Sequence, residues 1–229
     1  MKQILSGIII IAAASLMCIS CSCSGNREKT DGQADSTAVL SAADSTGNGT
    51  ETAIKPADLG EEPVFDIVTN LGTIRVKLYS KTPRHRDNFT KLALGHFYDG
   101  LLFHRVINGF MIQGGDPLTK DPANADMFGT GGPDYTIPAE FVNEYYHKKG
   151  ALAAARRGDA ANPKKASSGS QFYLVQDEMN CLALDGEYTV FGETIEGLDV
   201  IDRIAAVQTD RRDRPVEDVV IISVNPVTE

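Results

Sequence analysis

The sequence predicts a mostly β fold in which an antiparallel sheet closes into a barrel, and three observations support it. Short runs rich in apolar and β-branched residues recur between residues 64 and 224, as expected for strands. Turn signals separate several of them, including Asn108-Gly109, where both residues tolerate a positive φ. Two segments have the pattern of a helix. Because closure removes exposed strand edges, many short strands with few helices favour a barrel.

The expected elements follow in order along the folded part of the chain. Strands are expected at 64–69, 73–78, 101–107, 110–113, 135–141, 151–155, 170–176, 188–192 and 219–224. The first helix has Thr82 as its N-cap and Pro83 at its first position, and it stops at Gly95. The second helix is amphipathic and spans 198–205. Longer loops are expected at 117–133, which has the length of an insertion, and at 163–169.

Residues 1–20 have the pattern of a targeting segment. Lys2 supplies a positive charge, and the apolar run at 4–17 is too short for a comfortable membrane span. The run ends in small residues and cysteine, which resembles a bacterial lipobox, whose cysteine is lipidated after cleavage. Cys21 is the expected lipid anchor. Cys18 and Cys23 are the alternatives, because Cys18 stands where leucine is usual.

An ordinary secretory signal with incidental cysteines is the second interpretation of the same segment. Under both interpretations the mature protein works outside the cytoplasm. With the lipid anchor, we expect it in the cell envelope of a bacterium, attached to a membrane and facing the periplasm or the cell surface.

Residues 21–62 are expected to carry the lipid and to form a flexible acidic tether. The segment is low in aromatic residues and rich in small and polar ones, so it cannot bury enough apolar area to offset its ordering entropy. Between residues 24 and 62, eight acidic residues stand against three basic ones, within a net charge of −9 for the whole chain. Neither the tether nor the domain is basic, which argues against a nucleic-acid partner.

The cysteines and histidines do not predict a metal site or a disulfide framework. Three of the four cysteines crowd the end of the leader, and Cys181 stands alone in the domain. The four histidines are scattered, and no Cys/His spacing suggests zinc. We therefore expect no metal and no cofactor.

The chain is organised around the stretch 98–116, which reads YDGLLFHRVINGFMIQGGD. Arg105 is its anomaly. Alternation places this permanent charge on the same face of a strand as Phe103 and Ile107, where burial without a partner is costly. The simplest interpretation is an edge-strand arginine whose stem packs while its head stays in water.

The neighbours of Arg105 point to a more specific interpretation. The residues that carry a family resemblance in this stretch are Tyr98, Phe103, His104, Arg105, Phe110, Met111 and Gln113. Together they resemble the signature of the cyclophilin family of peptidyl-prolyl cis–trans isomerases. GTGGPDYTIPAEF, GALAAAR, SSGSQFYLV and LDGEYTVFG are similar to the bacterial branch. The resemblance covers 64–224 and implies a closed eight-stranded antiparallel barrel capped by two α-helices, over a domain at 63–229.

The resemblance also implies an activity and a site. Cyclophilins accelerate rotation about X–Pro bonds without nucleophile or cofactor, by binding the twisted amide better than the planar forms. The family role of Arg105 is to donate a hydrogen bond to the prolyl nitrogen. The substrate-binding positions correspond to Phe110, Met111, Gln113, Ala155, Arg156, Gln171, Tyr173, Leu184 and Tyr188. Proline-containing polypeptides, such as exported proteins during folding, are the implied partners, and we expect a monomer.

Several positions depart from the family pattern. Ala183 aligns with the tryptophan that contacts cyclosporin in many eukaryotic members, so we expect weak cyclosporin binding. Tyr173 stands where phenylalanine is common, and its hydroxyl needs a partner. Tyr188 stands at a position often held by histidine. Arg156 replaces a common asparagine at a position where the family uses mainly the backbone. His104 is expected to be a hydrogen-bonded structural residue. The 117–130 insertion is expected beside the substrate groove.

Two other functions fit parts of the sequence. A catalytically idle module that binds proline-containing segments, as a chaperone or scaffold, needs the apolar slot alone. A structural envelope lipoprotein needs only the anchor and the tether. Arg105, Gln113 and Phe110 favour the enzyme, because a pure binder needs a slot but no charge directed at the amide nitrogen.

Overall fold

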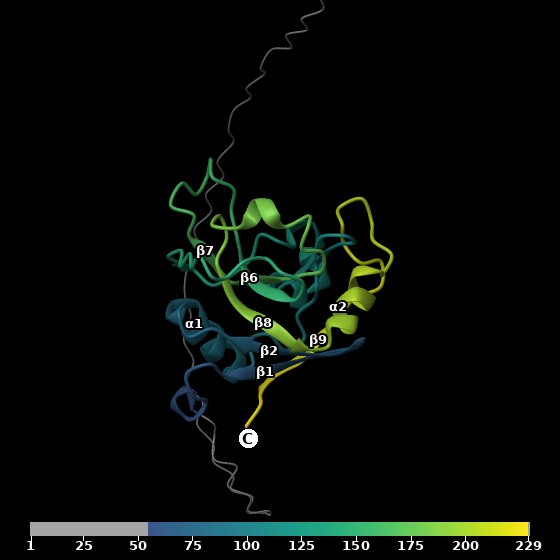
Figure 1. Ribbon diagram of the computed structural model, residues 1–229. Coiled ribbons are helices and arrows are strands. Elements are labelled where there is room, and N and C mark those ends of the chain that lie inside the picture. The colour runs from purple at the N-terminus through teal and green to yellow at the C-terminus, as the bar shows by residue number, and fades with distance from the viewer. Residues whose placement is uncertain (1–54, 229) are drawn as a thin grey trace, which may run out of the picture. The chain divides into compact units, whose positions relative to one another are not determined.

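The computed structural model describes residues 55–228 (Figure 1). The predicted targeting segment, Cys21 and the predicted tether up to residue 54 lie outside the described residues. The described strands are β1 Val64–Thr69, β2 Gly72–Leu78, β3 Arg105–Ile107, β4 Met111–Gly114, β5 Thr136–Ile137, β6 Ala151–Arg156, β7 Ser167–Val175, β8 Val190–Glu196 and β9 Ile221–Pro226. The α-helices are α1 Pro83–Leu94 and α2 Leu198–Ala205. Short 3₁₀ turns occur at η1 Pro56–Asp58, η2 Pro117–Lys120, η3 Pro122–Met127 and η4 Leu182–Leu184.

The strands form one antiparallel, curled sheet in the order β3-β4-β7-β6-β8-β2-β1-β9, and β5 pairs with β7 beside this path. The prediction of a closed barrel is wrong, because the strand ladder is open between β3 and β9. The two ends meet at an isolated bridge between Leu102 and Val220. β3 has three residues, and the N–H of Val106 donates to the carbonyl of Asp213 (2.7 Å) rather than to β9.

Several strand boundaries differ from the predictions; β8 and β9, for example, both begin and end later than the ranges 188–192 and 219–224. The segment predicted as a strand at 101–107 enters the sheet only at Arg105. The strand predicted at 135–141 is reduced to Thr136–Ile137, because Pro138 has no N–H to continue the ladder. Residues 167–169, predicted as part of a loop, open β7, where Ser167 and Ser168 pair with β5.

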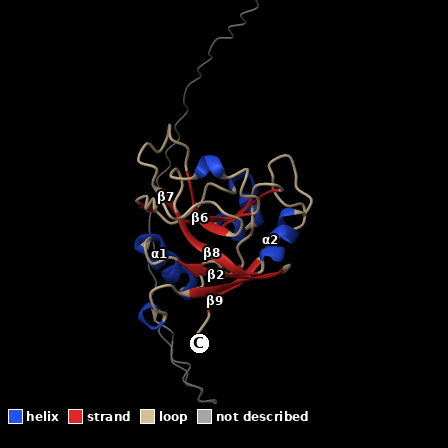
Figure 2. Ribbon diagram, in the orientation of Figure 1, coloured by secondary structure: helices blue, strands red, loops and turns tan. Residues whose placement is uncertain are grey.

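Both helices occupy their predicted positions. α1 begins at Pro83 after Thr82 and ends before Gly95, although the Thr82 side chain makes no capping hydrogen bond. Instead the carboxylate of Glu140 accepts from the N–H groups of Arg84 and His85, both at 3.1 Å. The helices flank the sheet on opposite sides (Figure 2). α2 buries the apolar side chains Val200, Ile201, Ile204 and Ala205.

β6 and β7 are buried on both faces, and the site lies on the face that points away from the main core. Leu152 and Phe172 point into the main core, while Ala153 and Tyr173 point to the other face and join a second apolar cluster with Met111. Alternation along each strand produces this division. The second face carries the pocket described below.

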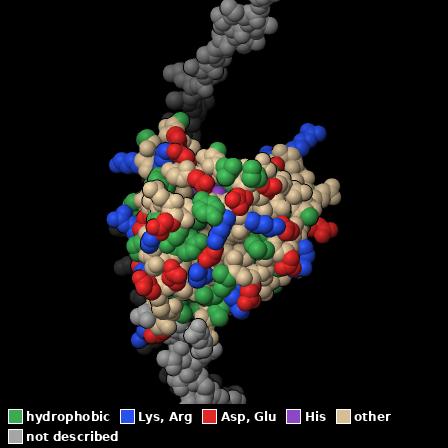
Figure 3. Space-filling model, viewed as in Figure 1, with side chains coloured by type: hydrophobic (Ala, Val, Ile, Leu, Met, Phe, Trp, Pro, Cys, Tyr) green, Lys and Arg blue, Asp and Glu red, His purple; other side chains and the backbone are tan. Residues whose placement is uncertain are grey.

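The surface of the described part is mixed in charge. Figure 3 shows basic and acidic side chains interspersed with apolar ones on the viewed face. Glu193, for example, pairs with both Lys77 (3.0 Å) and Lys148 (2.5 Å). Among residues 55–228, no helix has the length and apolar character needed to cross a membrane.

Candidate active site

A hairpin between β3 and β4 positions Arg105. Arg105 pairs with Gln113 across the ladder, and Ile107 pairs with Met111. The predicted turn at Asn108-Gly109 is confirmed: the N–H of Phe110 donates to the carbonyl of Ile107 (3.0 Å), and Gly109 has a φ of +78°. Glycine adopts this conformation without the steric cost of a Cβ.

The same turn explains why Phe110 and Met111 share one pocket. Strand alternation would place them on opposite faces, but β4 begins at Met111 and Phe110 belongs to the turn. Alternation also fails for Phe103, which precedes β3 and lies in the main core. Ile107, by contrast, lies on the pocket side with the second cluster.

Nine of the ten predicted site residues line one pocket of about 290 Å³. Met111 and Tyr173 are buried and form its floor, while Phe110, Leu184 and Tyr188 are half-buried around it. The lining residues are Arg105, Phe110, Met111, Gln113, Ala155, Arg156, Tyr173, Leu184 and Tyr188. The arrangement is a small slot with apolar and aromatic walls, and two guanidinium groups and an amide are among its lining groups.

The Arg105 side chain is 42% exposed and has polar neighbours on two sides. One terminal nitrogen donates to Gln113 Oε1 at 3.5 Å, and Nε lies 3.8 Å from Asp213 Oδ2. Both contacts are long, so the guanidinium keeps donors for another acceptor. Asp213 has a φ of +61°, a conformation uncommon outside glycine, and its role beside Arg105 was not predicted.

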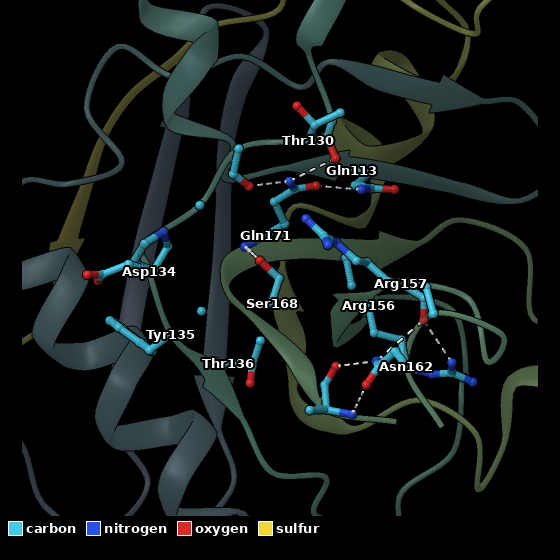
Figure 4. Close-up of a pocket in the computed structure, with 18 residues that line it drawn as sticks. Gln113, Thr130, Asp134, Tyr135, Thr136, Arg156, Arg157, Asn162, Ser168 and Gln171 are labelled. Atoms are coloured by element: carbon cyan, nitrogen blue, oxygen red, sulfur yellow. Dashed lines mark hydrogen bonds between the residues drawn. The ribbon is translucent and has the colours of Figure 1, made fainter. Parts of the chain in front are cut away.

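A chain of amides links Arg105 to the insertion. Gln113 Nε2 donates to Gln171 Oε1 (3.0 Å), and Gln171 Nε2 donates to the carbonyls of Gly129 (3.1 Å) and Gly131 (2.7 Å). Gln171, the tenth predicted residue, therefore lies behind the slot rather than in its lining. Figure 4 shows it between Gln113 and the loop that carries Thr130.

The buried carboxylate of Asp116 organises the insertion. Its oxygens accept from the N–H groups of Leu118 (2.8 Å), Gly129 (2.5 Å) and Gly131 (3.1 Å). The end of the loop lines a second pocket of about 640 Å³, next to the slot. Arg156 and Arg157 lie on the opposite side of this pocket from the loop (Figure 4).

The Arg156 side chain has contacts that the sequence did not indicate. It is 4% exposed, and its guanidinium carbon lies 4.3 Å from the centre of the Tyr188 ring. Nε donates to the Glu187 carbonyl (2.9 Å), and a terminal nitrogen pairs with Asp159 Oδ1 (2.5 Å). The Arg156 side chain therefore supports the Tyr188 ring by stacking on it.

His104 differs from its prediction. Neither ring nitrogen has a hydrogen-bond partner among the described residues, although the side chain is buried. Burial lowers the pKa of His104 to about 4. The ring packs under the insertion, where a side-chain Cβ at Gly129 would lie 3.6 Å from Nε2.

Tyr173 has a partner for its hydroxyl that the sequence did not identify. His147 Nε2 lies 2.8 Å from it, and Asp185 Oδ1 lies 2.6 Å from His147 Nδ1. Burial raises the pKa of Tyr173 well above its usual value. Tyrosine at a position where phenylalanine is common was the one sequence signal for a partner here.

The described residues contain no group of three or more His, Cys, Asp or Glu side chains placed to hold a metal ion. Cys181 is buried, and burial raises the pKa of its thiol to about 11. A thiol in this state is a poor nucleophile at neutral pH.

The comparisons with known proteins all indicate the same family. The family model "Cyclophilin type peptidyl-prolyl cis-trans isomerase/CLD" matches residues 64–226. Peptidyl-prolyl cis-trans isomerase B of Streptomyces anulatus is 39% identical over 185 residues, covering 72% of this chain and 97% of that protein. Human peptidyl-prolyl cis-trans isomerase-like 1 is 36% identical over 172 residues, covering 75% of this chain and 96% of that protein.

Solved structures agree with the sequence relatives. A cyclophilin-type peptidyl-prolyl cis-trans isomerase of Cryptosporidium parvum has a TM-score of 0.65 and 27% identity, covering 73% of this chain and 99% of that one. The same protein in the presence of the dipeptide Ala-Pro has a TM-score of 0.63. The relatives come from bacteria and eukaryotes, so the similarity to the bacterial branch stays a prediction. The chain belongs to the cyclophilin family of peptidyl-prolyl cis-trans isomerases.

Proposed function

We propose that the domain accelerates cis–trans rotation of X–Pro bonds by holding the twisted amide against Arg105. The bond resists rotation because of its partial double-bond character, with a barrier of about 18–20 kcal/mol. In the twisted state the prolyl nitrogen regains a lone pair. A guanidinium that donates to this nitrogen stabilises the transition state more than either planar state, which is the requirement for catalysis.

The observation that carries the proposal is the position of Arg105 in the lining of an apolar slot. The slot has a volume of about 290 Å³, which suits a proline ring, and Phe110, Met111 and Leu184 supply apolar walls. Gln113 is held by Gln171 at 3.0 Å and presents its amide beside Arg105. The likeness to a protein solved in the presence of Ala-Pro supports a prolyl ligand.

The magnitudes are compatible with this role. A thousandfold acceleration requires about 4 kcal/mol of transition-state stabilisation. A hydrogen bond from a charged donor contributes about 1.5–3 kcal/mol. The remainder is assigned to water exclusion by the slot and to fixation of the acyl side of the bond by Gln113 and the backbone of β6.

The activity is tested with the full chain and an Ala-Pro peptide, by exchange NMR. We expect wild type to accelerate cis–trans exchange and Arg105→Ala to lose about ten- to a hundredfold in kcat/KM, the order of a lost charge-assisted hydrogen bond. Arg105→Lys keeps the charge but not the planar fork and should recover only part of the loss. A wild-type chain that binds the peptide without accelerating exchange would favour the non-catalytic binding module.

We also propose that the protein works in the cell envelope, on exported polypeptides, held to a membrane through lipid on Cys21. Support comes from the sequence of the leader, whose apolar run is followed by a lipobox-like cysteine. Metabolic labelling with a fatty acid should give a membrane-bound, labelled protein. Cys21→Ala should abolish the label, while Cys18→Ala and Cys23→Ala should keep it. Equal labelling of all three variants would contradict the assignment.

A further inference from the structure

Two buried histidines, His85 and His147, each form a relay of the same chemistry. In each relay a carboxylate contacts the histidine, and the histidine contacts a hydroxyl. In the first, His85 lies 2.7 Å from Glu140 Oε2 and 2.9 Å from Ser167 Oγ. In the second, His147 lies 2.6 Å from Asp185 Oδ1 and 2.8 Å from the Tyr173 hydroxyl. Tyr173 lines the slot and Ser167 does not, so the second relay reaches the site.

Proton positions in the second relay follow from its acceptors. Asp185 Oδ1 accepts from the backbone N–H of His147 (2.8 Å) and lies 2.6 Å from Nδ1, so Nδ1 carries the proton. Burial lowers the pKa of His147 despite the opposing effect of Asp185, so the ring is neutral at pH 7. Nε2 is then an acceptor, and the Tyr173 hydroxyl donates to it.

The relay joins three separate parts of the chain. Tyr173 belongs to β7, and His147 lies in the segment that leads into β6. Asp185 follows Leu184 directly, in a tight turn where the N–H of Tyr188 donates to the carbonyl of Leu184 (3.0 Å). Leu184 and Tyr188 both line the slot, so the relay links the floor of the slot to the turn that forms its wall.

Aromatic packing continues the same connection. The His147 and Tyr173 rings are nearly parallel, at 10°, and Tyr173 meets Tyr188 edge to face with centroids 6.1 Å apart. Rotation of the Tyr173 ring would disturb both contacts. Among the described residues, no side-chain hydrogen bond connects the relay to Arg105 or Gln113, although Gln113 lies opposite Tyr173 in the β4–β7 ladder.

We propose that His147 and Asp185 are positioning residues for the slot. Through the Tyr173 hydroxyl they fix the ring on which the proline packs, and they hold the 184–188 turn against it. The inference rests on the proposed function of the slot. Under this proposal Tyr173, at a position where phenylalanine is common, contributes to the affinity for X–Pro segments and not to the chemical step.

The test measures kcat and KM for an Ala-Pro peptide by exchange NMR with the full chain. Tyr173→Phe removes the donor to Nε2, and His147→Asn keeps a donor for Asp185 but does not reach the hydroxyl. Each should raise KM by about three- to tenfold, the effect of one buried hydrogen bond, with kcat within about twofold of wild type. His147→Gln, whose longer amide reaches the hydroxyl, should recover part of the affinity.

A double-mutant cycle and a matched control separate positioning from general stability. Tyr173→Phe with His147→Asn should be no worse than the worse single variant, because both changes break one bond. Ser167→Ala cuts the corresponding bond of the other relay and should lower stability without changing KM. An unchanged KM for Tyr173→Phe, additive effects in the cycle, or an equal rise in KM for Ser167→Ala would overturn the proposal.

Failure of the proposed function gives a different result. If wild type binds the peptide without accelerating exchange, the isomerase proposal fails, and the same variants are compared by their dissociation constants from chemical-shift titration. The positioning proposal then requires the same order of affinities. If wild type does not bind the peptide, both proposals are wrong.

Discussion

At the scale of single residues, the side chains that distinguish this slot are those that do not follow the usual family pattern. Tyr173, Tyr188 and Arg156 form one connected group, in which Arg156 stacks on Tyr188 at 4.3 Å and Tyr188 packs on Tyr173. Each of these departures was visible in the sequence. Their mutual contacts were not, because they join residues from three separate segments of the chain.

Replacing Arg156 tests the stacked arrangement. Arg156→Asn removes the cation–π contact and the bonds to Glu187 and Asp159, so we expect the free energy of unfolding to fall by about 2 kcal/mol. KM for an Ala-Pro peptide should rise several-fold. Arg156→Lys keeps the charge without the planar ring stacking and should be intermediate. A fully active and stable Arg156→Asn, by urea unfolding and exchange NMR, would show that the side chain does not support the slot.

Ala183 tests the expected drug response. It is exposed and directly precedes Leu184 of the slot, at the position of the cyclosporin-binding tryptophan in many eukaryotic relatives. Wild type should bind cyclosporin with a dissociation constant weaker than nanomolar, and Ala183→Trp should tighten it by about tenfold or more, as expected for a large aromatic contact. Titration calorimetry gives both values. Nanomolar binding by wild type would refute the expectation.

At the scale of elements, alternation predicted most of the site and turns explain the exceptions. Met111, Gln113 and Tyr173 lie where strand alternation places them. Phe110 reaches the same pocket because it belongs to a turn, which periodicity does not describe. The end of β5 at Ile137 was predictable from Pro138, whereas the open ladder between β3 and β9 depends on pairing between distant segments.

The conformation of the 117–130 insertion depends on the carboxylate of Asp116, so replacing this one residue tests how the loop is held. Asp116→Asn keeps the volume but puts an N–H₂ group in place of one oxygen that accepts from Leu118, Gly129 or Gly131. The free energy of unfolding should fall by about 2 kcal/mol, because buried donors lose a charged acceptor. Hydrogen exchange should accelerate at Gly129 and Gly131 but not at Ile67 in β1. Unchanged protection at both glycines would mean that Asp116 does not hold the loop.

At the scale of the whole molecule, three buried neutral histidines make stability depend on pH. Burial is the main cause that lowers the pKa of His85, His104 and His147. As pH falls below the unfolded value of about 6.5, the unfolded chain binds protons that the folded chain does not, so stability decreases. His104 alone, with a pKa of about 4, lowers the free energy of unfolding by roughly 3 kcal/mol as the pH falls from about 6.5 to about 4.

Urea unfolding between pH 7.5 and pH 5 measures this effect. We expect the free energy of unfolding to fall once the pH drops below about 6.5. In that range His104→Leu should lose less free energy than wild type, by up to about 1.4 kcal/mol per pH unit, the contribution of one histidine. Replacement of His96, whose side chain is 73% exposed, provides a control for the substitution of a surface histidine. Equal stability of wild type at both ends of the range would contradict the burial argument.

The most direct test of the account separates binding from catalysis at Arg105. Exchange NMR on an Ala-Pro peptide gives the dissociation constant and the exchange rate on the protein in one experiment. If the guanidinium acts on the twisted amide, Arg105→Ala should keep the dissociation constant within about threefold while the bound exchange rate falls by about ten- to a hundredfold. A variant whose loss lies wholly in affinity, with the bound rate intact, would show that Arg105 only holds the substrate.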